Sequence, residues 1–457
     1  MRKPSSNTGT LTVILIVAAG VILTLYFAAF YLLHAHGTKK TSPVDQFLEN
    51  VRQTDAIKPR PGREPRYIDK WNHKDIKERE LAGLPPLVID PKGREAKWEH
   101  GTIRYPAIRA YDEHHYPNYV PLLSRIEEWN PDDPDPPSEF TETLMHFNFS
   151  NPQERAMATA YRHAEVPFKV YDVPFIDEVS DKWSDDYLSH VLREGGKATR
   201  HIERSASNHF MYWALKPWKS KLIPGYKGPT EIVTEEMDFD QWLQHAQQAD
   251  HDKTAVPKNK DESEKPYYYF MTNAMKGDQS ASFVGRDLPV FSKGEKNFFI
   301  ARPELNKGIQ CRFGMRGIIA EAHYDSGRNM IGMIKGNKRY ILNPPRACKQ
   351  IDLIGDADHP SFRHSRLDWS NITVAREHDF ASVDAIDTIL RTGEVLFVPS
   401  YWMHYIVSLQ YSVQCNSRFG PPESMASFEP IQKCFGWEDA YPPERERSGR
   451  RSRGAFA

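Results

Sequence analysis

The stretch AEAHYDSGRNMIGMIKGNKRYILNPP, residues 320–345, decides the fold of this chain. In it, an apolar run over 329–334 is followed by a Gly336-Asn337 turn and a second run over 338–342. Gly-Asn pairs favour turns between strands, and Asn343-Pro344-Pro345 ends the second run because proline cannot donate to a sheet. The stretch therefore predicts a strand, a turn and a second strand.

The same stretch contains two potential metal ligands, His323 and Asp325. Residues two apart in an extended chain point to the same side, so a His-x-Asp tripeptide can present an imidazole and a carboxylate together. Two imidazoles and one carboxylate on one face of iron leave positions open for other reactants. The tripeptide alone is weak evidence, because His73-Lys74-Asp75 has the same form in a charged stretch.

A third candidate ligand, His404, stands far downstream in GEVLFVPSYWMHYIVSL, residues 393–409. A distant ligand on a separate strand is what a closed barrel would bring to the first two. In the same run, Phe397 and Trp402 are expected in the core. The sequence thus predicts a metal site made by His323, Asp325 and His404.

Short apolar or alternating runs, one near residue 170 and the others from residue 267 onward, are separated by turn residues. They cover 168–171, 267–270, 309–313, 328–334, 338–342, 394–398 and 412–416. Helical spacing marks 184–193 and 238–249. Together these patterns predict a mostly β (α+β) fold, either a sandwich or a barrel.

The composition is that of a globular protein without a strong charge bias. The 457 residues include 39% hydrophobic residues, 34 prolines and 12% aromatic residues, which favour loops and short strands over a helical bundle. The net charge of -1 gives no reason to expect a nucleic-acid partner, because phosphate binding normally requires a basic excess.

An uncharged apolar run, LTVILIVAAGVILTLYFAAFYLL, covers residues 11–33. A helix of this length reaches roughly 35 Å, which is enough to cross a bilayer. The alternative is a cleavable signal peptide, whose apolar region is shorter, about 7–15 residues. Basic residues flank the run on both sides, so charge does not fix the orientation. We expect a single transmembrane signal-anchor of type II, with the remaining chain in the lumen of the endoplasmic reticulum or Golgi.

The segments that follow from these patterns divide the chain into five parts. They are a short tail at 1–10, the signal-anchor at 11–33, a Pro-rich stem at 34–140, a catalytic domain at 165–420 and a tail with a basic end at 421–457. The stem either wraps onto the folded domain or leads to it.

Two further features would bear on a lumenal location. Four cysteines allow one or two disulfides without forming a framework: Cys311, Cys348, Cys415 and Cys434. The tripeptides Asn148-Phe149-Ser150 and Asn371-Ile372-Thr373 have the form of N-glycosylation acceptors.

The stretches 320–345 and 393–409 resemble the cupin-like branch of the JmjC oxygenases, and within it most closely the hypoxia-inducible-factor asparaginyl hydroxylase type. The resemblance covers roughly residues 165–420 and implies a double-stranded β-helix, or jelly roll, with flanking helices. It also implies Fe(II) held by His323, Asp325 and His404, with 2-oxoglutarate as co-substrate and O2 as oxidant.

The resemblance assigns further residues to the cofactor. Lys338, fifteen positions beyond the first histidine, would pair with the far carboxylate of 2-oxoglutarate, and Tyr269 would hydrogen-bond the same carboxylate. Asn329 and Asn416 would support the metal or contact the cofactor. The family places its His-x-Asp at the opening of the second barrel strand.

One position departs from the family pattern. Ala320 stands where close relatives carry a threonine that contacts the cofactor carboxylate. Loss of one neutral hydrogen bond costs about 0.5–1.5 kcal/mol, less than loss of the lysine salt bridge would cost. Arg312 and Arg316, near the barrel mouth, are expected to face solvent.

The expected function is a membrane-anchored Fe(II)- and 2-oxoglutarate-dependent dioxygenase that hydroxylates a protein or peptide side chain. A JmjC-type lysine demethylase, which uses the same iron chemistry, is one alternative. A non-catalytic cupin-like interaction domain tethered to the membrane is the other. The intact ligand set and Lys338 count against the second alternative.

Overall fold

The computed structural model describes residues 96–99, 102–104, 117–194, 199–212, 232–252, 266–275, 282–292, 296–356, 359–420 and 428–436. The predicted signal-anchor at 11–33, the His73-Lys74-Asp75 tripeptide and the basic end of the tail lie outside these residues. Within the described ranges, no helix combines the length and the apolar character needed to cross a membrane.

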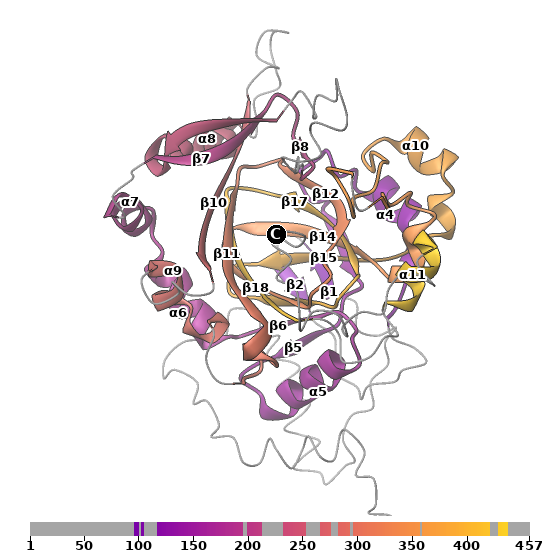
Figure 1. The fold of residues 1–457 in the computed structure, drawn as a ribbon, viewed down its shortest axis with the longest axis horizontal. Helices are drawn as coiled ribbons and strands as arrows, with labels where there is room; N and C mark the ends of the chain where they lie inside the picture. Colours follow the sequence, from indigo (N-terminus) through magenta and orange to yellow (C-terminus); the bar gives the residue numbers. More distant parts are fainter. Residues whose placement is uncertain are drawn as a thin grey trace, which may run out of the picture. The chain divides into compact units, whose positions relative to one another are not determined.

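Two large sheets form the centre of the domain (Figure 1). The larger sheet has nine strands in the order β5 (His146–Asn148), β6 (Phe168–Tyr171), β16 (Val395–Val398), β13 (Asn329–Lys335), β18 (Ser412–Phe419), β11 (Asn306–Gly314), β10 (Tyr267–Met275), β7 (Thr199–Ser205) and β9 (Val233–Asp238). The smaller has six, in the order β3 (Val120–Pro121), β15 (Asp384–Arg391), β14 (Asn337–Asn343), β17 (Met403–Ser408), β12 (Ile319–Tyr324) and β8 (His209–Phe210). A third, small sheet contains β2 (Thr102–Arg104), β1 (Ala96–Glu99) and β4 (Glu139–Glu142).

Helices lie on the outer faces of the two large sheets (Figure 1). Those beside the nine-stranded sheet are α5 (Pro152–His163), α6 (Pro174–Lys182), α7 (Asp185–Glu194), α8 (Phe239–His251) and α9 (Phe283–Asp287). Those on the side of the six-stranded sheet are α4 (Leu122–Glu128), α10 (Ile372–Glu377) and α11 (Glu429–Phe435). Short 3-10 turns are η4 (Pro289–Phe291), η5 (Pro303–Leu305), η6 (Pro345–Cys348) and η7 (Phe380–Ser382). This is the cupin-type, jelly-roll-like arrangement with flanking helices that the sequence predicts.

The Gly336 turn joins the two sheets rather than two neighbouring strands. It follows β13, which pairs with β16 and β18, and leads into β14, which pairs with β15 and β17. Gly336 has a φ of +73°, and a Cβ there would lie 2.2 Å from the carbonyl oxygen of Tyr411. Glycine is therefore required where the chain crosses from sheet to sheet.

The space between the sheets is apolar in one part and polar in another. Its apolar part is filled by Leu144, Ile331, Met333, Tyr340, Leu342, Ile386, Leu390, Leu396, Val398, Trp402 and Ile406. Side chains alternate along a strand, so Lys338 shares the inner face of β14 with Tyr340 and Leu342. The predicted core positions of Trp402 and Phe397 are both confirmed: Trp402 lies between the sheets, and Phe397 packs in the core on the outer face of β16.

A buried group of charges ties strands of the three sheets together. Lys169 Nζ lies 2.6 Å from Glu142 Oε2 and 3.3 Å from Glu394 Oε2, and all three side chains are at most 1% exposed. Arg391 lies 2.5 Å from the other oxygen of Glu142. Two cations and two anions make the group neutral overall, which is the condition under which buried charge is tolerated.

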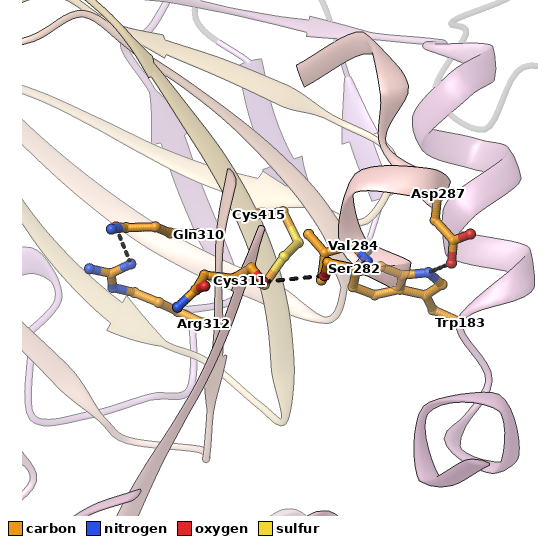
Figure 2. The surroundings of a disulfide bond; sticks show 9 residues. Trp183, Ser282, Val284, Asp287, Gln310, Cys311, Arg312 and Cys415 are labelled. Carbon is orange, nitrogen blue, oxygen red and sulfur yellow. Dashed lines mark hydrogen bonds between the residues drawn. A yellow bond between two sulfur atoms is a disulfide. The ribbon is translucent and has the colours of Figure 1, made fainter. Parts of the chain in front are cut away.

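Both pairs of cysteines form disulfides, so every cysteine of the chain is oxidised. Cys311 of β11 is bonded to Cys415 of β18, and Cys348 of η6 is bonded to Cys434 of α11. Figure 2 shows the first bond on the side of β11 that faces α9, with Arg312 on the opposite side of the strand.

Part of the predicted stem packs on the folded domain. Strand β3 pairs with β15, and the following α4 buries Leu122 and Ile126 against the six-stranded sheet. The described part of the stem, residues 117–140, therefore wraps onto the folded domain instead of only leading to it.

Candidate metal centre

The two histidines lie side by side on paired strands. His323 of β12 is the register partner of His404 of β17, and their ring centroids are 4.2 Å apart. Asp325 stands just after the end of β12, and one ligand atom from each of the three residues lies within 4.8 Å of the others. Sheet pairing therefore brings together three residues that are far apart in the sequence.

Backbone carbonyl groups orient both imidazoles. His323 Nδ1 lies 2.7 Å from the carbonyl oxygen of Glu321, and His404 Nδ1 lies 3.0 Å from that of Trp402. This geometry assigns the ring proton to Nδ1 and leaves Nε2 as a lone-pair donor. Burial lowers the pKa of both histidines, which favours the neutral form that a metal requires.

Asp325 is held by three donors. Asn329 Nδ2 donates to Oδ2 at 2.7 Å, Arg418 lies 2.9 Å from the same oxygen, and Arg363 Nη1 donates to Oδ1 at 3.2 Å. Although burial raises the pKa of Asp325, Arg418 and Arg363 hold it well below its usual range. Asn416 Nδ2 in turn donates to Asn329 Oδ1 at 2.8 Å. The carboxylate is thus kept ionised and in a fixed orientation.

This donor set fits Fe(II). Two neutral imidazoles and one carboxylate, largely buried and oriented by a second layer of hydrogen bonds, are the arrangement found in non-haem iron oxygenases. Mutual distances of up to 4.8 Å between ligand atoms allow all three to approach one ion after small adjustments.

Lys338 is a buried cation with no anionic partner. The side chain is 1% exposed, and within the described ranges no carboxylate or hydrogen-bond acceptor lies against Nζ. Its Nζ lies over the ring of Tyr269, 5.7 Å from the ring centroid. Burial, together with the charge of Arg312, lowers the pKa of Lys338 to about 7. A buried ammonium group of this kind calls for an anion.

The surroundings of Lys338 suit the tail of a dicarboxylate. Burial raises the pKa of Tyr269 to about 12, so its hydroxyl remains protonated. Tyr340, on the same face of β14 as Lys338, donates to Gln414 Oε1 at 2.5 Å. Ala320 packs against the apolar interior and adds no hydroxyl. Lys338 and Tyr269 therefore fit a 2-oxoglutarate carboxylate. The hydroxyl donor that the family pattern places at position 320 is missing.

The structure adds three residues that the sequence reasoning missed. Arg418 and Arg363 contact Asp325, and His364 stacks on His323 with ring centroids 4.9 Å apart. Residue 364 also forms an isolated β-bridge with residue 323. Arg418 could have been inferred, because it lies two residues after Asn416 on one strand and shares its face. Arg363 and His364 come from an irregular segment without a local signal.

Two expectations about this region are wrong. Asp325 lies past the end of β12 and His323 near it, so the His-x-Asp closes this strand instead of opening one. Arg316 does not face solvent: its side chain is 10% exposed and pairs with Asp135 while donating to the Leu409 carbonyl. Arg312 is half-buried and lies near enough to lower the pKa of Lys338.

Comparison with known proteins gives one family match. The sequence profile of the family described as "Cupin-like domain" matches residues 154–424, more than half of the chain. This interval is slightly wider than the predicted domain at 165–420.

Three relatives illustrate the range of curated proteins that are similar. Human tRNA wybutosine-synthesizing protein 5 is 26% identical over 242 residues, 52% of this chain and 66% of the relative. Lysine-specific demethylase JMJ30 of Arabidopsis thaliana is 28% identical over 115 residues, 25% of this chain and 26% of the relative. Human HSPB1-associated protein 1 is 30% identical over 106 residues, 23% of this chain and 22% of the relative. The chain thus spans just under two thirds of the first relative and about a quarter of the others.

Proposed function

The chain belongs to the cupin-like, JmjC-related domain family, and from this premise we propose that it is a membrane-anchored Fe(II)- and 2-oxoglutarate-dependent dioxygenase. The observation that carries the proposal is the pairing of two sites in one barrel. His323, Asp325 and His404 converge in an iron-type ligand set, and the partnerless Lys338 faces the same interior. A scaffold without chemistry would have no need for a buried, uncompensated ammonium group.

Each side chain has a distinct role in this proposal. His323, His404 and Asp325 would hold Fe(II), and Asn329 with Asn416 would fix the orientation of the aspartate. Lys338 would pair with the far carboxylate of 2-oxoglutarate, and Tyr269 would donate a hydrogen bond to the same group. Together they position the co-substrate and exclude water from the reacting end.

The bound iron and 2-oxoglutarate would supply the oxidation itself, in which 2-oxoglutarate and O2 become succinate and CO2 and one oxygen atom enters a substrate C–H bond. The protein's own contribution is electrostatic. Arg418 and Arg363 keep Asp325 anionic, and burial, which lowers the pKa of both histidines, keeps their imidazoles neutral. The backbone carbonyls hold the ring proton on Nδ1, so that Nε2 is available.

The proposed substrate is a protein or peptide side chain. Among the relatives, one name refers to tRNA modification and another to lysine demethylation. A net charge of -1 gives no support to tRNA as the substrate, and the proposed lumenal location argues against chromatin. Two disulfides favour that location, because disulfides persist mainly in oxidising compartments.

The test uses the full-length chain in detergent with Fe(II), 2-oxoglutarate and O2, and measures succinate with and without a peptide panel. We expect turnover by the wild type and none by His323→Ala or Asp325→Ala. His73→Ala, which alters the other His-x-Asp tripeptide, serves as the matched control and should retain full turnover. Undiminished succinate formation by either triad variant would refute the proposed ligands.

The substrate class is resolved in the same assay. Hydroxylated peptide supports the proposal, formaldehyde release from methyl-lysine peptides indicates a demethylase, and tRNA-dependent turnover indicates an RNA substrate. A wild-type protein that binds neither iron nor 2-oxoglutarate would be the non-catalytic interaction domain.

A further inference from the structure

We propose that Asn371 carries an N-linked glycan in the mature protein and that Asn148, the other acceptor tripeptide in the described part of the chain, does not. The inference rests on the lumenal placement proposed above and is independent of the iron chemistry. It would mark a modified surface beside α10, on the outside of the six-stranded sheet (Figure 1).

The modification has a defined chemistry. Asn Nδ2 attacks the anomeric carbon of an oligosaccharide carried on a lipid diphosphate, an N–C bond forms, and the C–O bond to the diphosphate breaks. The diphosphate leaves with the electron pair, and the amide nitrogen loses one proton. The acceptor must be Asn-x-Ser or Asn-x-Thr, and its product needs room for a bulky, solvated sugar.

The two tripeptides adopt the same local turn, so local conformation does not distinguish them. Asn371 Oδ1 accepts from the backbone N–H groups of Thr373 and Val374 at 3.0 and 3.3 Å. Asn148 Oδ1 accepts from those of Ser150 and Asn151 at 2.8 and 3.2 Å. In each case the carbonyl oxygen is occupied by the residues two and three positions ahead.

Burial separates the two asparagines. Asn148 lies in β5, which is paired with β6, and the residue is 1% exposed. Asn371 caps α10, and both it and Thr373 are exposed. Within the described ranges, no acceptor lies against Asn371 Nδ2. A sugar on Asn371 would extend into solvent, whereas one on Asn148 would have to displace the strand pair.

The disulfides provide an independent reason to expect exposure to the glycosylation machinery. All four cysteines are paired, and they join elements that are well separated in sequence, by 104 and 86 residues. Such bonds are rare in cytosolic proteins and form in the compartment where N-linked glycans are added. Oxidised cysteines and an exposed acceptor tripeptide therefore point to the same location.

The experiment expresses the full-length chain in cultured animal cells and compares its electrophoretic mobility before and after digestion with an N-glycosidase. We expect one glycan on the wild type. Asn371→Asp keeps a side-chain oxygen for the helix cap but removes Nδ2, and Thr373→Ala removes the hydroxyl of the acceptor; both should lose the shift completely.

Two matched variants complete the test. Thr373→Ser preserves the acceptor and should retain the shift. Ser150→Ala destroys the other tripeptide without altering Asn148, and should also retain it. The proposal is overturned if the wild type shows no glycosidase-sensitive shift, if the shift persists in Asn371→Asp, or if Ser150→Ala abolishes it.

Discussion

At the scale of single residues, Lys338 carries the most specific information about the co-substrate. Its ammonium group is buried, faces the polar part of the barrel and has no anion among the described residues. Burial lowers its pKa to about 7, so the cofactor-free protein bears an unfavourable charge near neutral pH. A bound carboxylate would relieve this cost.

Replacing Lys338 with methionine should weaken 2-oxoglutarate binding on the order of 10- to 100-fold, the value of one charge-assisted hydrogen bond. The measurement is anaerobic calorimetric titration of the metal-loaded protein. Lys335→Met is the control, because Lys335 pairs with Asp185 at the surface and should not affect affinity. Equal affinities for both variants would show that Lys338 does not bind the co-substrate.

The same lysine predicts a pH dependence of stability. Its pKa in the folded protein, about 7, lies below the ordinary value of 10.5. Between these values the unfolded chain binds more protons, so the free energy of unfolding of the cofactor-free protein should rise with pH. Below about pH 7 the penalty is complete and constant. The measurement is the free energy of unfolding in urea from pH 7 to 10, which should rise less steeply with pH in Lys338→Met than in the wild type. The same dependence on pH in both proteins would contradict this prediction.

Replacing Asn329 or Asn416 should lower the metal affinity to different extents. Asn329 contacts Asp325 directly, whereas Asn416 acts only through Asn329. Asn329→Ala should lower metal affinity by about 10-fold or more, the usual cost of losing an outer-shell partner, and Asn416→Ala by less. Titration with Co(II) measures both, and a larger loss for Asn416→Ala would contradict the proposed chain of hydrogen bonds.

The residues of the candidate metal centre differ in how far the sequence could predict them. His323, Asp325 and His404 could be selected because strand-like flanks surround them, while His73-Lys74-Asp75 lacks such flanks. Arg363 and His364 could not, because an irregular segment reaches the site only through tertiary packing on β12. Their positions depend on the whole fold rather than on any local pattern.

At the scale of elements, the strands of the barrel are held by charge as well as by apolar packing. Lys169 of β6 joins Glu142 of β4 to Glu394, which precedes β16, and Arg391 of β15 completes the group. Each member is almost fully buried, so its charge depends on the other three.

Lys169→Met should therefore destabilise the domain by about 3–5 kcal/mol, because it leaves two buried carboxylates with one arginine. The free energy of unfolding in urea measures the effect. Lys182→Met removes a lysine that is 49% exposed and paired with Asp287, and should cost less than about 1 kcal/mol. Similar losses for the two variants would show that burial of the group does not matter.

Most elements with a simple pattern could be predicted, and those without one could not. The runs at 309–313, 338–342 and 412–416 correspond to β11, β14 and β18 with slightly different ends. Strand β15 was missed because charged residues interrupt its apolar run: Asp387 and Arg391 are buried by ion pairs that only the folded protein reveals. Helix α5 was missed because its amphipathic face is short on apolar residues and includes the buried Glu154 and Arg162.

At the scale of the whole molecule, two sheets from one continuous domain enclose a space with a candidate metal site and the separate cation Lys338. The sequence alone could predict this enclosure from a family resemblance, but not the pairing of β12 with β17 that places the histidines together. Both disulfides and the packing of residues 117–140 add cross-links around the barrel. Membrane anchoring through 11–33 remains a prediction.

The most direct test of the account is anaerobic addition of Fe(II) and then 2-oxoglutarate to the purified full-length protein, followed by absorption spectroscopy. Chelation of protein-bound Fe(II) by a 2-oxo acid gives a visible charge-transfer band. The account predicts this band for the wild type, its loss in His323→Ala and His404→Ala, and its appearance only at higher 2-oxoglutarate concentrations in Lys338→Met. No band in the wild type, or an unchanged band in both histidine variants, would contradict it.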